Sequence, residues 1–337
     1  MLGTALCLTK VIKIASTRGV AERMVSTAFS PKTEPRPAYP AFSGVASRWA
    51  WVLLRDVILG LALSHSAFPW YSYLGGLVSE RACFALTICG AHTITYIAFN
   101  GTLQLLENCQ WEPLMKCRIG RKTMELPDKP LVKQLLTEAA INHFVTSPIT
   151  AALLFTVVKW CGMPPPTDPL PSVANLALLF VAAHTFNDFG FYWTHRLLHH
   201  RLFYGTFHKQ HHAFKGTIGP AAEFAHPLEA VLSNQIPTVG MLLAIGAHPL
   251  VQGVWLVLRL TQTYEVHSGY DFSESLIGKL GLTANESSFH DHHHTYNVGN
   301  FGAEHTDWLF GTMDHYLRDG GRAGYMEKRK GESKKAQ

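Results

Sequence analysis

The chain has 337 residues, of which 47% are hydrophobic and only 16% are charged. This charged fraction is too low for an ordinary soluble protein of one or two domains and favours a membrane protein. The net charge of +5 suits anionic lipid headgroups. No basic stripe carries interleaved aromatic residues, so nucleic-acid binding is not expected.

The N-terminal 45 residues are basic and rich in serine and threonine, with prolines at Pro31, Pro35, Pro37 and Pro40. We interpret them as a disordered cytosolic tail, with a targeting peptide as the alternative. We expect a membrane-embedded domain at 46–318, with a histidine core at 184–315. A charged tail is expected at 319–337, disordered from Met326 onward.

Uncharged windows long enough to cross a membrane follow the tail. A helix needs about 19 residues for this, and such windows lie at 57–79, 82–106, 139–158 and 169–187. A longer window, 230–258, is broken by His248-Pro249 and predicts a hairpin of helices at 228–247 and 250–264, because proline starts helices better than it continues them. The expected fold is all-α: an integral membrane bundle of about four transmembrane helices plus a helical hairpin.

Basic residues mark the predicted cytosolic side. They precede the first window and follow the second and the fourth, whereas the intervening loops carry almost none. By the positive-inside rule both termini and the histidine-rich segments from His195 onward face the cytosol. Lys334 and Lys335 stand at the positions of a dilysine signal for the endoplasmic reticulum membrane. A lysine-rich tail that ends this way by chance is the alternative.

Histidine is the unusual residue of this chain, because thirteen of its nineteen histidines lie between His195 and His294. Most form clusters at 195–200, 208–212 and 290–294. Imidazole is a good ligand for iron, copper, nickel and zinc, and clustered imidazoles would repel one another if protonated. The clusters therefore predict a metal site. A satisfied core or surface role is favoured for the isolated histidines His65, His92, His143, His305 and His315.

Local spacing identifies the candidate ligands. Helical spacing places His195 and His199 on one stripe, and the pattern H-x-x-H-H recurs in the other two clusters. His292 falls on the opposite side, and His200 is expected to face solvent. The metal candidates are His195, His199, His208, His211, His212, His267, His290, His293 and His294.

Nine imidazoles exceed the demand of one ion and favour a binuclear site. The six cysteines form no C-x-x-C pair and all precede the histidine region, so thiolate ligands are not expected. The chain lacks the H-E-x-x-H motif of zinc proteases, and it has one Glu-x-x-His, at 223–226, where soluble di-iron bundles use two. Two iron ions could use all nine imidazoles and keep positions for O2.

The clusters carry a family resemblance. Segments 192–199 (YWTHRLLH), 208–212 (HKQHH), 267–272 (HSGYDF) and 289–294 (FHDHHH) resemble the fatty acid hydroxylase and sterol desaturase superfamily. Segment 222–229 (AEFAHPLE) is similar to the C-4 methylsterol oxidase group within it. The resemblance covers about residues 80 to 317.

The resemblance implies an oxygen-dependent di-iron monooxygenase of the endoplasmic reticulum with a cytosolic metal cap. It implies electrons from NAD(P)H through cytochrome b5 and its reductase, and partners among sterols, membrane lipids and other sterol demethylation enzymes. The implied reaction in sterol biosynthesis converts a C-4 methyl to alcohol, aldehyde and carboxylate. The implied reaction also requires such a centre on chemical grounds. An unactivated C–H bond offers no acidic proton, so its oxidation requires a redox metal with oxygen.

Further roles are hypotheses. Asp188 and Glu229 are expected to hold ligand imidazoles in place, with an ion pair to Arg259 as the alternative for Asp188. Tyr192 and Tyr270 are expected to hydrogen-bond near the oxygen. His226 either caps the first hairpin helix or contacts metal.

The sequence is also compatible with two other kinds of function. A related hydroxylase or desaturase could act on another sterol position, a sphingolipid or a fatty acyl chain. A histidine-rich metal transporter is the non-enzyme alternative, although transport would place the ligands at mid-membrane along a pore.

Overall fold

The computed structural model describes residues 35–120, 129–214 and 216–335, without the side chains of 332–335. The chain divides into two compact units, Met1–Pro37 and Ala38–Gln337, and the second contains the helices α3 to α16. The predicted N-terminal tail before residue 35 lies outside the described residues, as do the side chains of the dilysine pair.

The described residues form helices and no strand, which confirms the all-α prediction. An isolated bridge joins Arg118 to Tyr270. In chain order the helices are α3 (Phe42–Gly75), α4 (Glu80–Asn108), α5 (Glu112–Met115), α6 (Lys129–Ile141), the π-helix η1 (Asn142–Thr146), α7 (Ser147–Trp160), α8 (Val173–Leu198), the π-helix η2 (Tyr204–His208), the 3-10 helices η3 (His211–Ala213) and η4 (Gly219–Glu223), α9 (Pro227–Glu229), the π-helix η5 (Ala230–Gly240), α10 (Met241–Ala244), α11 (Pro249–Val266), α12 (Leu276–Lys279), α13 (Ser287–Tyr296), α14 (Glu304–Phe310), α15 (Asp314–Arg318) and α16 (Gly321–Lys335).

Among the described residues, three helical stretches are long and apolar enough to cross a membrane: Phe42–Gly75, Glu80–Asn108 and Lys129–Trp160. They contain the second and third predicted windows, 82–106 and 139–158, and the first window, 57–79, up to Gly75. The fourth window forms most of α8, which is not one of these stretches. From His184 onward α8 carries polar side chains, including Asn187 and Asp188, and these lower its mean hydropathy.

Helix boundaries are set by local capping. Ser79 and Ser172 cap α4 and α8, because each side-chain oxygen accepts a backbone N–H three residues later. His248 caps α11 in the same sense, with Nδ1 accepting the Leu250 N–H at 3.2 Å and Pro249 at the first helical position. The predicted break of the hairpin at His248-Pro249 is therefore confirmed.

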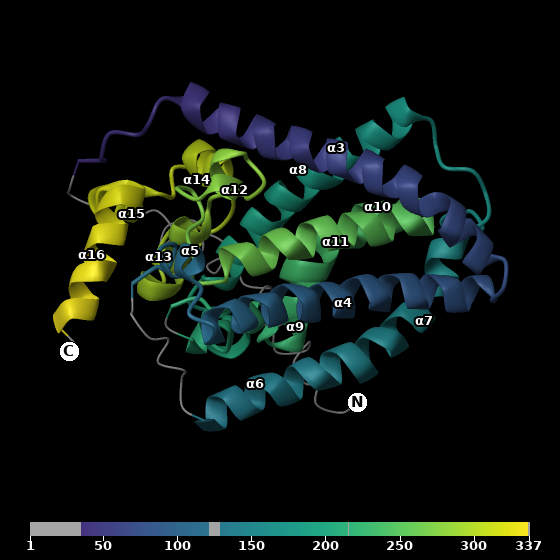
Figure 1. The fold of residues 1–337 in the computed structure, drawn as a ribbon, viewed down its shortest axis with the longest axis horizontal. Helices are drawn as coiled ribbons and strands as arrows, with labels where there is room; N and C mark the ends of the chain where they lie inside the picture. Colours follow the sequence, from purple (N-terminus) through teal and green to yellow (C-terminus); the bar gives the residue numbers. More distant parts are fainter. Residues whose placement is uncertain (1–34, 121–128, 215, 336–337) are drawn as a thin grey trace, which may run out of the picture. The chain divides into compact units, whose positions relative to one another are not determined.

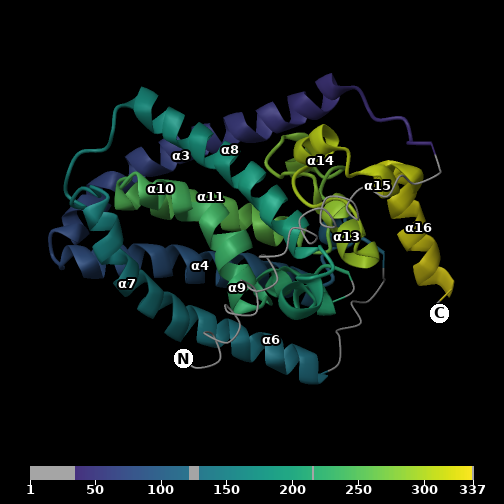
Figure 2. The same cartoon turned by 180° about the vertical axis from the view of Figure 1, so that it is seen from behind.

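The hairpin lies against the long helices. Figures 1 and 2 show α11 running beside α3 and α4, with α8 close to it. Phe180 of α8, Leu242 of α10 and Trp255 of α11 are buried in one apolar cluster. The Trp255 indole also donates to the Thr238 carbonyl at 2.6 Å, which joins the two arms of the hairpin.

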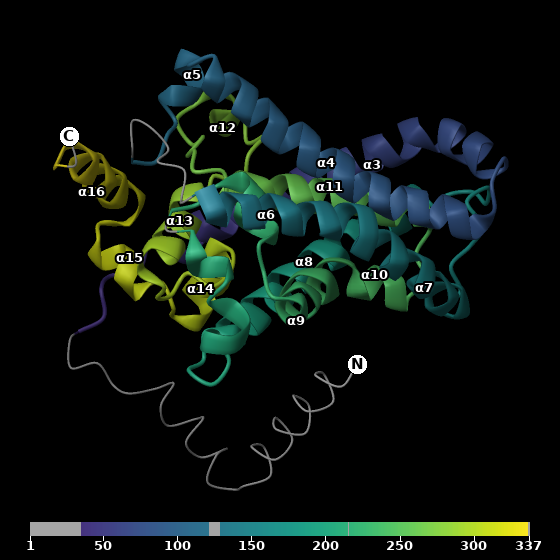
Figure 3. The same cartoon turned by 90° about the horizontal axis from the view of Figure 1, so that it is seen from below.

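The helices that follow α11 gather at one end of the bundle. Figure 3 shows α13 to α16 at this end, with α7 and α10 toward the other. The helix α16 spans Gly321–Lys335, so it includes residues from Met326 onward that were expected to be disordered. Tyr325 is fully buried and donates to Asp291 at 2.6 Å, and Arg322 pairs with Asp271 at 3.0 Å, so contacts made after folding order this segment.

Candidate metal centre

The nine candidate ligands come from five separate segments that meet at this end of the bundle. His195 lies in the last turns of α8, and His199 and His267 directly follow α8 and α11. The others lie on η2, η3 and α13. The structure brings all nine into two groups: His195, His199, His208, His212 and His293 in group one, and His211, His267, His290 and His294 in group two.

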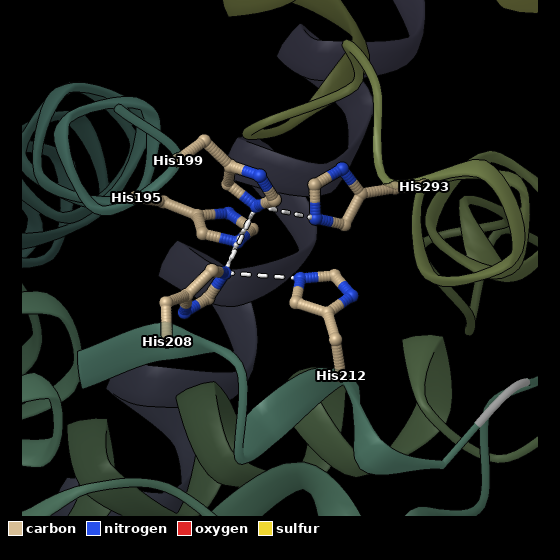
Figure 4. Close-up of side chains that lie close together, drawn as sticks. All are labelled: His195, His199, His208, His212 and His293. Atoms are coloured by element: carbon tan, nitrogen blue, oxygen red, sulfur yellow. Dashed lines mark hydrogen bonds between the residues drawn. The ribbon is translucent and has the colours of Figure 1, made fainter. Parts of the chain in front are cut away.

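Group one converges on its ring nitrogens, as Figure 4 shows. His208 Nε2 lies 3.0 Å from His195 Nε2, 2.9 Å from His199 Nε2 and 3.0 Å from His212 Nε2. A metal about 2.1 Å from each of two nitrogens at right angles would hold them about 3.0 Å apart. The spacing is therefore that of neighbouring ligands around one ion.

Group two has the same spacing. His290 Nε2 lies 2.9 Å from His267 Nε2 and 3.1 Å from His294 Nε2. Its rings adjoin group one, because the ring centroids of His212 and His294 are 4.6 Å apart. The two groups are thus adjacent sites, as a binuclear centre requires.

Hydrogen bonds to backbone carbonyls show which ring nitrogens carry protons. The Nδ1 atoms of His195, His267 and His293 lie 2.6 to 2.8 Å from carbonyl oxygens, to which only an N–H can donate. Their Nε2 atoms are then unprotonated in the neutral ring. Lone pairs that face one another at about 3 Å repel unless a cation lies between them. The donor set therefore fits metal ions.

Burial keeps these imidazoles neutral. It lowers the pKa of His267 to about 4 and that of His293 to about 3, even though carbonyl hydrogen bonds oppose both shifts. Burial, followed by neighbouring imidazoles, also holds the pKa of His290 and His294 well below its usual value. Neutral imidazole is the form that binds metal.

Of the two predicted supporting carboxylates, only Glu229 contacts a candidate ligand. Its Oε1 lies 2.8 Å from His208 Nδ1. Asp188 instead lies 3.2 Å from His184 and 3.5 Å from His305. The expectation that Asp188 orients a ligand imidazole is wrong, because His184 stands one helical turn earlier and competes for it.

The two predicted tyrosines also have other partners. Tyr192 accepts from Arg196 at 2.9 Å and contacts the Thr312 hydroxyl at 3.1 Å, while Tyr270 accepts from Arg118 at 3.4 Å. Both hydroxyls were expected to hydrogen-bond near the oxygen, and the structure gives them these partners instead.

The tyrosine beside group one is Tyr204, which sequence reasoning missed. Its ring centroid lies 5.7 Å from that of His199 and 6.0 Å from those of His208 and His212. Its position four residues before His208 was the available signal.

Several other histidines lie outside the two groups. His226 caps α9 by accepting the Leu228 N–H at 3.1 Å, which favours the capping alternative. His292 pairs with Asp319 at 3.2 Å, apart from its neighbours, in keeping with its predicted separate position. His200 is half-buried and not fully solvent-facing, and its Nδ1 accepts the Leu202 N–H.

A cavity of about 360 Å³ reaches the metal groups from among the helices. Its apolar lining comes from α4, α7 and the hairpin, and includes Ile88, Leu154 and Leu243. At the metal end it is lined by His195, His211, His267 and His290. An apolar cavity that ends at candidate metal ligands suits an apolar molecule with one reacting position.

The sequence is similar to known proteins that carry related names. The family model described as fatty acid hydroxylase matches residues 180–312. Methylsterol monooxygenase 2-1 of Arabidopsis thaliana is 30% identical over 261 residues, which cover 72% of this chain and 93% of that protein. A fatty acid hydroxylase of Mycosarcoma maydis is 32% identical over 63% of this chain and 55% of its own length.

A putative methylsterol monooxygenase of Dictyostelium discoideum is 40% identical over 146 residues, which cover 43% of this chain. The chain spans about half the length of that relative, 54%. No solved structure gives a significant match.

Proposed function

The chain belongs to the fatty acid hydroxylase and sterol desaturase superfamily, and we propose that it is a membrane monooxygenase that oxidises the C-4 methyl group of sterol intermediates. The observation that carries the proposal is the convergence of nine imidazoles into two adjacent groups at the end of an apolar cavity. The similarity to methylsterol monooxygenases supports the choice of substrate.

In this proposal the two histidine groups each hold one iron ion. Bound iron supplies the redox chemistry by which O2 attacks an unactivated C–H bond. Each methyl converted to alcohol consumes one O2, two electrons and two protons and releases one water. Two further oxidations give aldehyde and carboxylate. The electrons come from NAD(P)H through cytochrome b5 and its reductase, and the protein works beside other sterol demethylation enzymes.

We place the protein in the endoplasmic reticulum membrane, with the metal end and both termini in the cytosol. The three long apolar helices support a membrane position. Arg196, Arg201 and Lys209 lie at or beyond the end of α8 that carries the histidines, which supports the cytosolic side by the positive-inside rule. A sterol would then enter the cavity from the lipid, while electrons arrive from water.

The direct test is turnover by purified protein loaded with iron anaerobically and then given O2 and an electron donor. A panel of 4-methylsterols and acyl lipids is offered, and the products are separated by mass. We expect oxidised 4-methylsterol as the main product. Turnover of acyl lipid without oxidised sterol would reject the proposed substrate.

Hydroxylation of a fatty acyl chain is the second candidate, favoured by the similarity to the fatty acid hydroxylase of Mycosarcoma maydis. The same panel separates the two candidates. Metal transport is less favoured, because the nine candidate ligands converge in two adjacent groups and are not spaced along a path through the helices.

Glu229 is predicted to increase the affinity of the protein for metal. Its carboxylate lies 2.8 Å from the Nδ1 of His208, and loss of such a partner typically weakens metal binding by about 10 to 100-fold. We therefore expect Glu229→Gln to release iron to a competing chelator at a correspondingly lower chelator concentration. Glu274→Gln is the control, since this side chain is 73% exposed in an ion pair with Arg322. Equal iron retention by both variants would contradict the predicted role of Glu229 in metal binding.

A further inference from the structure

A third group of potential metal ligands contains none of the nine histidines of the metal centre. It consists of His92 of α4, His143 of η1 and Glu223 of η4, whose ligand atoms all lie within 4.8 Å of one another. His92 Nε2 lies 2.9 Å from Glu223 Oε1, and His143 Nε2 lies 3.4 Å from Glu223 Oε2. The centroids of the two imidazole rings are 4.1 Å apart. Three segments far apart in the sequence therefore contribute to one small site.

Two histidines and one carboxylate are a common set of metal ligands in proteins. Catalytic zinc sites use two histidines and one glutamate with a fourth position left for water, and non-haem Fe(II) sites use two histidines and a carboxylate. A metal ion at 2.0 to 2.2 Å holds two ligands about 2.8 to 3.6 Å apart for angles from 90° to tetrahedral. The distances from His92 and His143 to the Glu223 oxygens fall within this range.

A hydroxyl lies beside the second nitrogen of each ring. His92 Nδ1 is 3.2 Å from Ser147 Oγ, and His143 Nδ1 is 3.2 Å from Thr93 Oγ1. A hydroxyl oxygen can accept an N–H, so both rings can carry their proton at Nδ1 and present the Nε2 lone pair toward Glu223. Histidines that bind metal are usually oriented by such a hydrogen bond at the other ring nitrogen.

The Glu223 carboxylate is held in place in the same way. Its Oε1 accepts from the Tyr264 hydroxyl, and its Oε2 accepts from Asn142 Nδ2 at 3.0 Å. Carboxylates that bind metal are commonly hydrogen-bonded like this. His143 Nε2, in contrast, is buried and makes no hydrogen bond with any residue that the structure describes. A buried nitrogen without a partner is costly, and a cation between it and Glu223 would satisfy both groups.

The position of this third group within the helices also favours a ligand. His92 and His143 lie in two of the stretches that are able to cross a membrane, where ionisable side chains are expensive and mark functional sites. His143 belongs to the π-helix η1, a rare conformation that occurs frequently at functional sites. His92 and Glu223 line the large cavity, which gives an ion a path to the site.

We propose that His92, His143 and Glu223 bind one divalent transition-metal ion, separate from the two histidine groups. Both Nε2 atoms and one carboxylate oxygen are the protein ligands, and water takes the remaining position. The ion joins α4, η1 and η4. The competing arrangement is an ion pair in which protonated His92 neutralises Glu223 and no metal binds. The proposal does not depend on the reaction that the nine-histidine centre performs.

The test counts the metal ions bound to protein that is purified in detergent, loaded anaerobically with Fe(II) and dialysed against buffered Zn²⁺. Iron and zinc per chain are measured by mass spectrometry. The wild type should hold about one metal ion per chain more than His143→Phe or Glu223→Gln. His143→Phe keeps an aromatic ring beside His92 and Tyr96 and removes the ring nitrogens. Metal retained by the nine-histidine centre shows that each variant is folded.

Two further variants refine the comparison. His65→Phe changes an exposed histidine of α3 in the same way and should keep the metal content of the wild type. Ser147→Ala keeps the three ligands but removes the hydroxyl beside His92 Nδ1. It should raise the Zn²⁺ concentration needed to half-fill the site by about 10 to 100-fold.

His315→Phe tests another small group of potential ligands, His292, His315 and Asp319. An extra ion that is lost from His315→Phe and kept by both His143→Phe and Glu223→Gln would overturn the proposal. Equal metal content in the wild type and these last two variants, which the ion pair predicts, would also overturn it. A difference of about one ion per chain supports the site whether or not the protein oxidises sterols.

Discussion

Replacing His199 by glutamine is expected to reduce sterol oxidation by more than about 100-fold and to lower the iron content of the purified protein. His199 Nε2 lies 2.9 Å from His208 Nε2, 3.1 Å from His293 Nε2 and 3.3 Å from His195 Nε2. The substitution removes one of five nitrogens from group one and leaves the remaining four unable to enclose the ion equally well. Iron per chain and product formed per minute are the two measurements.

The neighbouring histidine provides a matched control. His200 is half-buried, lies outside both groups and caps its own turn through the Leu202 N–H. His200→Gln should keep the wild-type iron content and rate. If His199→Gln retained full iron, or if both variants lost iron to the same extent, His199 would not be a ligand of the centre.

The features predicted best from the sequence depend on short-range geometry. His195 and His199 share a helix face because they are four residues apart, and the break at His248-Pro249 depends on proline alone. To predict that the three clusters converge required one further argument. Clustered imidazoles that are buried together must share a cation. The structure brings together all nine predicted residues and no other histidine in these two groups of the described chain.

Most of the errors come from contacts between distant segments. Asp188 was expected to orient a ligand imidazole, but its nearer partner, His184, lies one turn earlier on the same helix, and its second partner, His305, comes from a helix more than one hundred residues later. The grouping of Glu223 with His92 and His143, which was not predicted from the sequence, forms only after three separate segments pack together. The order of α16 likewise depends on Asp271 and Asp291, which no local pattern connects to it. Single-residue roles therefore required the packed structure.

Stripping the metal is expected to make the protein sensitive to acid. Burial lowers the pKa of His267 to about 4 and that of His293 to about 3, whereas both titrate near 6.5 in the unfolded chain. Below pH 6.5 the unfolded chain therefore binds protons that the folded chain does not. The contribution of these two groups to the free energy of unfolding is fully present above that pH. It falls as the pH is lowered, by about 2 kcal/mol for each group between pH 6.5 and pH 5.

Unfolding of chelator-treated protein in detergent, measured at pH 8, 6.5 and 5, tests this expectation. Metal-free His293→Gln should lose about 2 kcal/mol less than the metal-free wild type between pH 6.5 and pH 5, because one buried titrating group is gone. His65→Gln, which changes an exposed histidine, should follow the wild type. The same pH dependence in all three proteins would mean that the imidazoles of the centre are open to protons in the metal-free state, so that burial does not keep them neutral before metal binds.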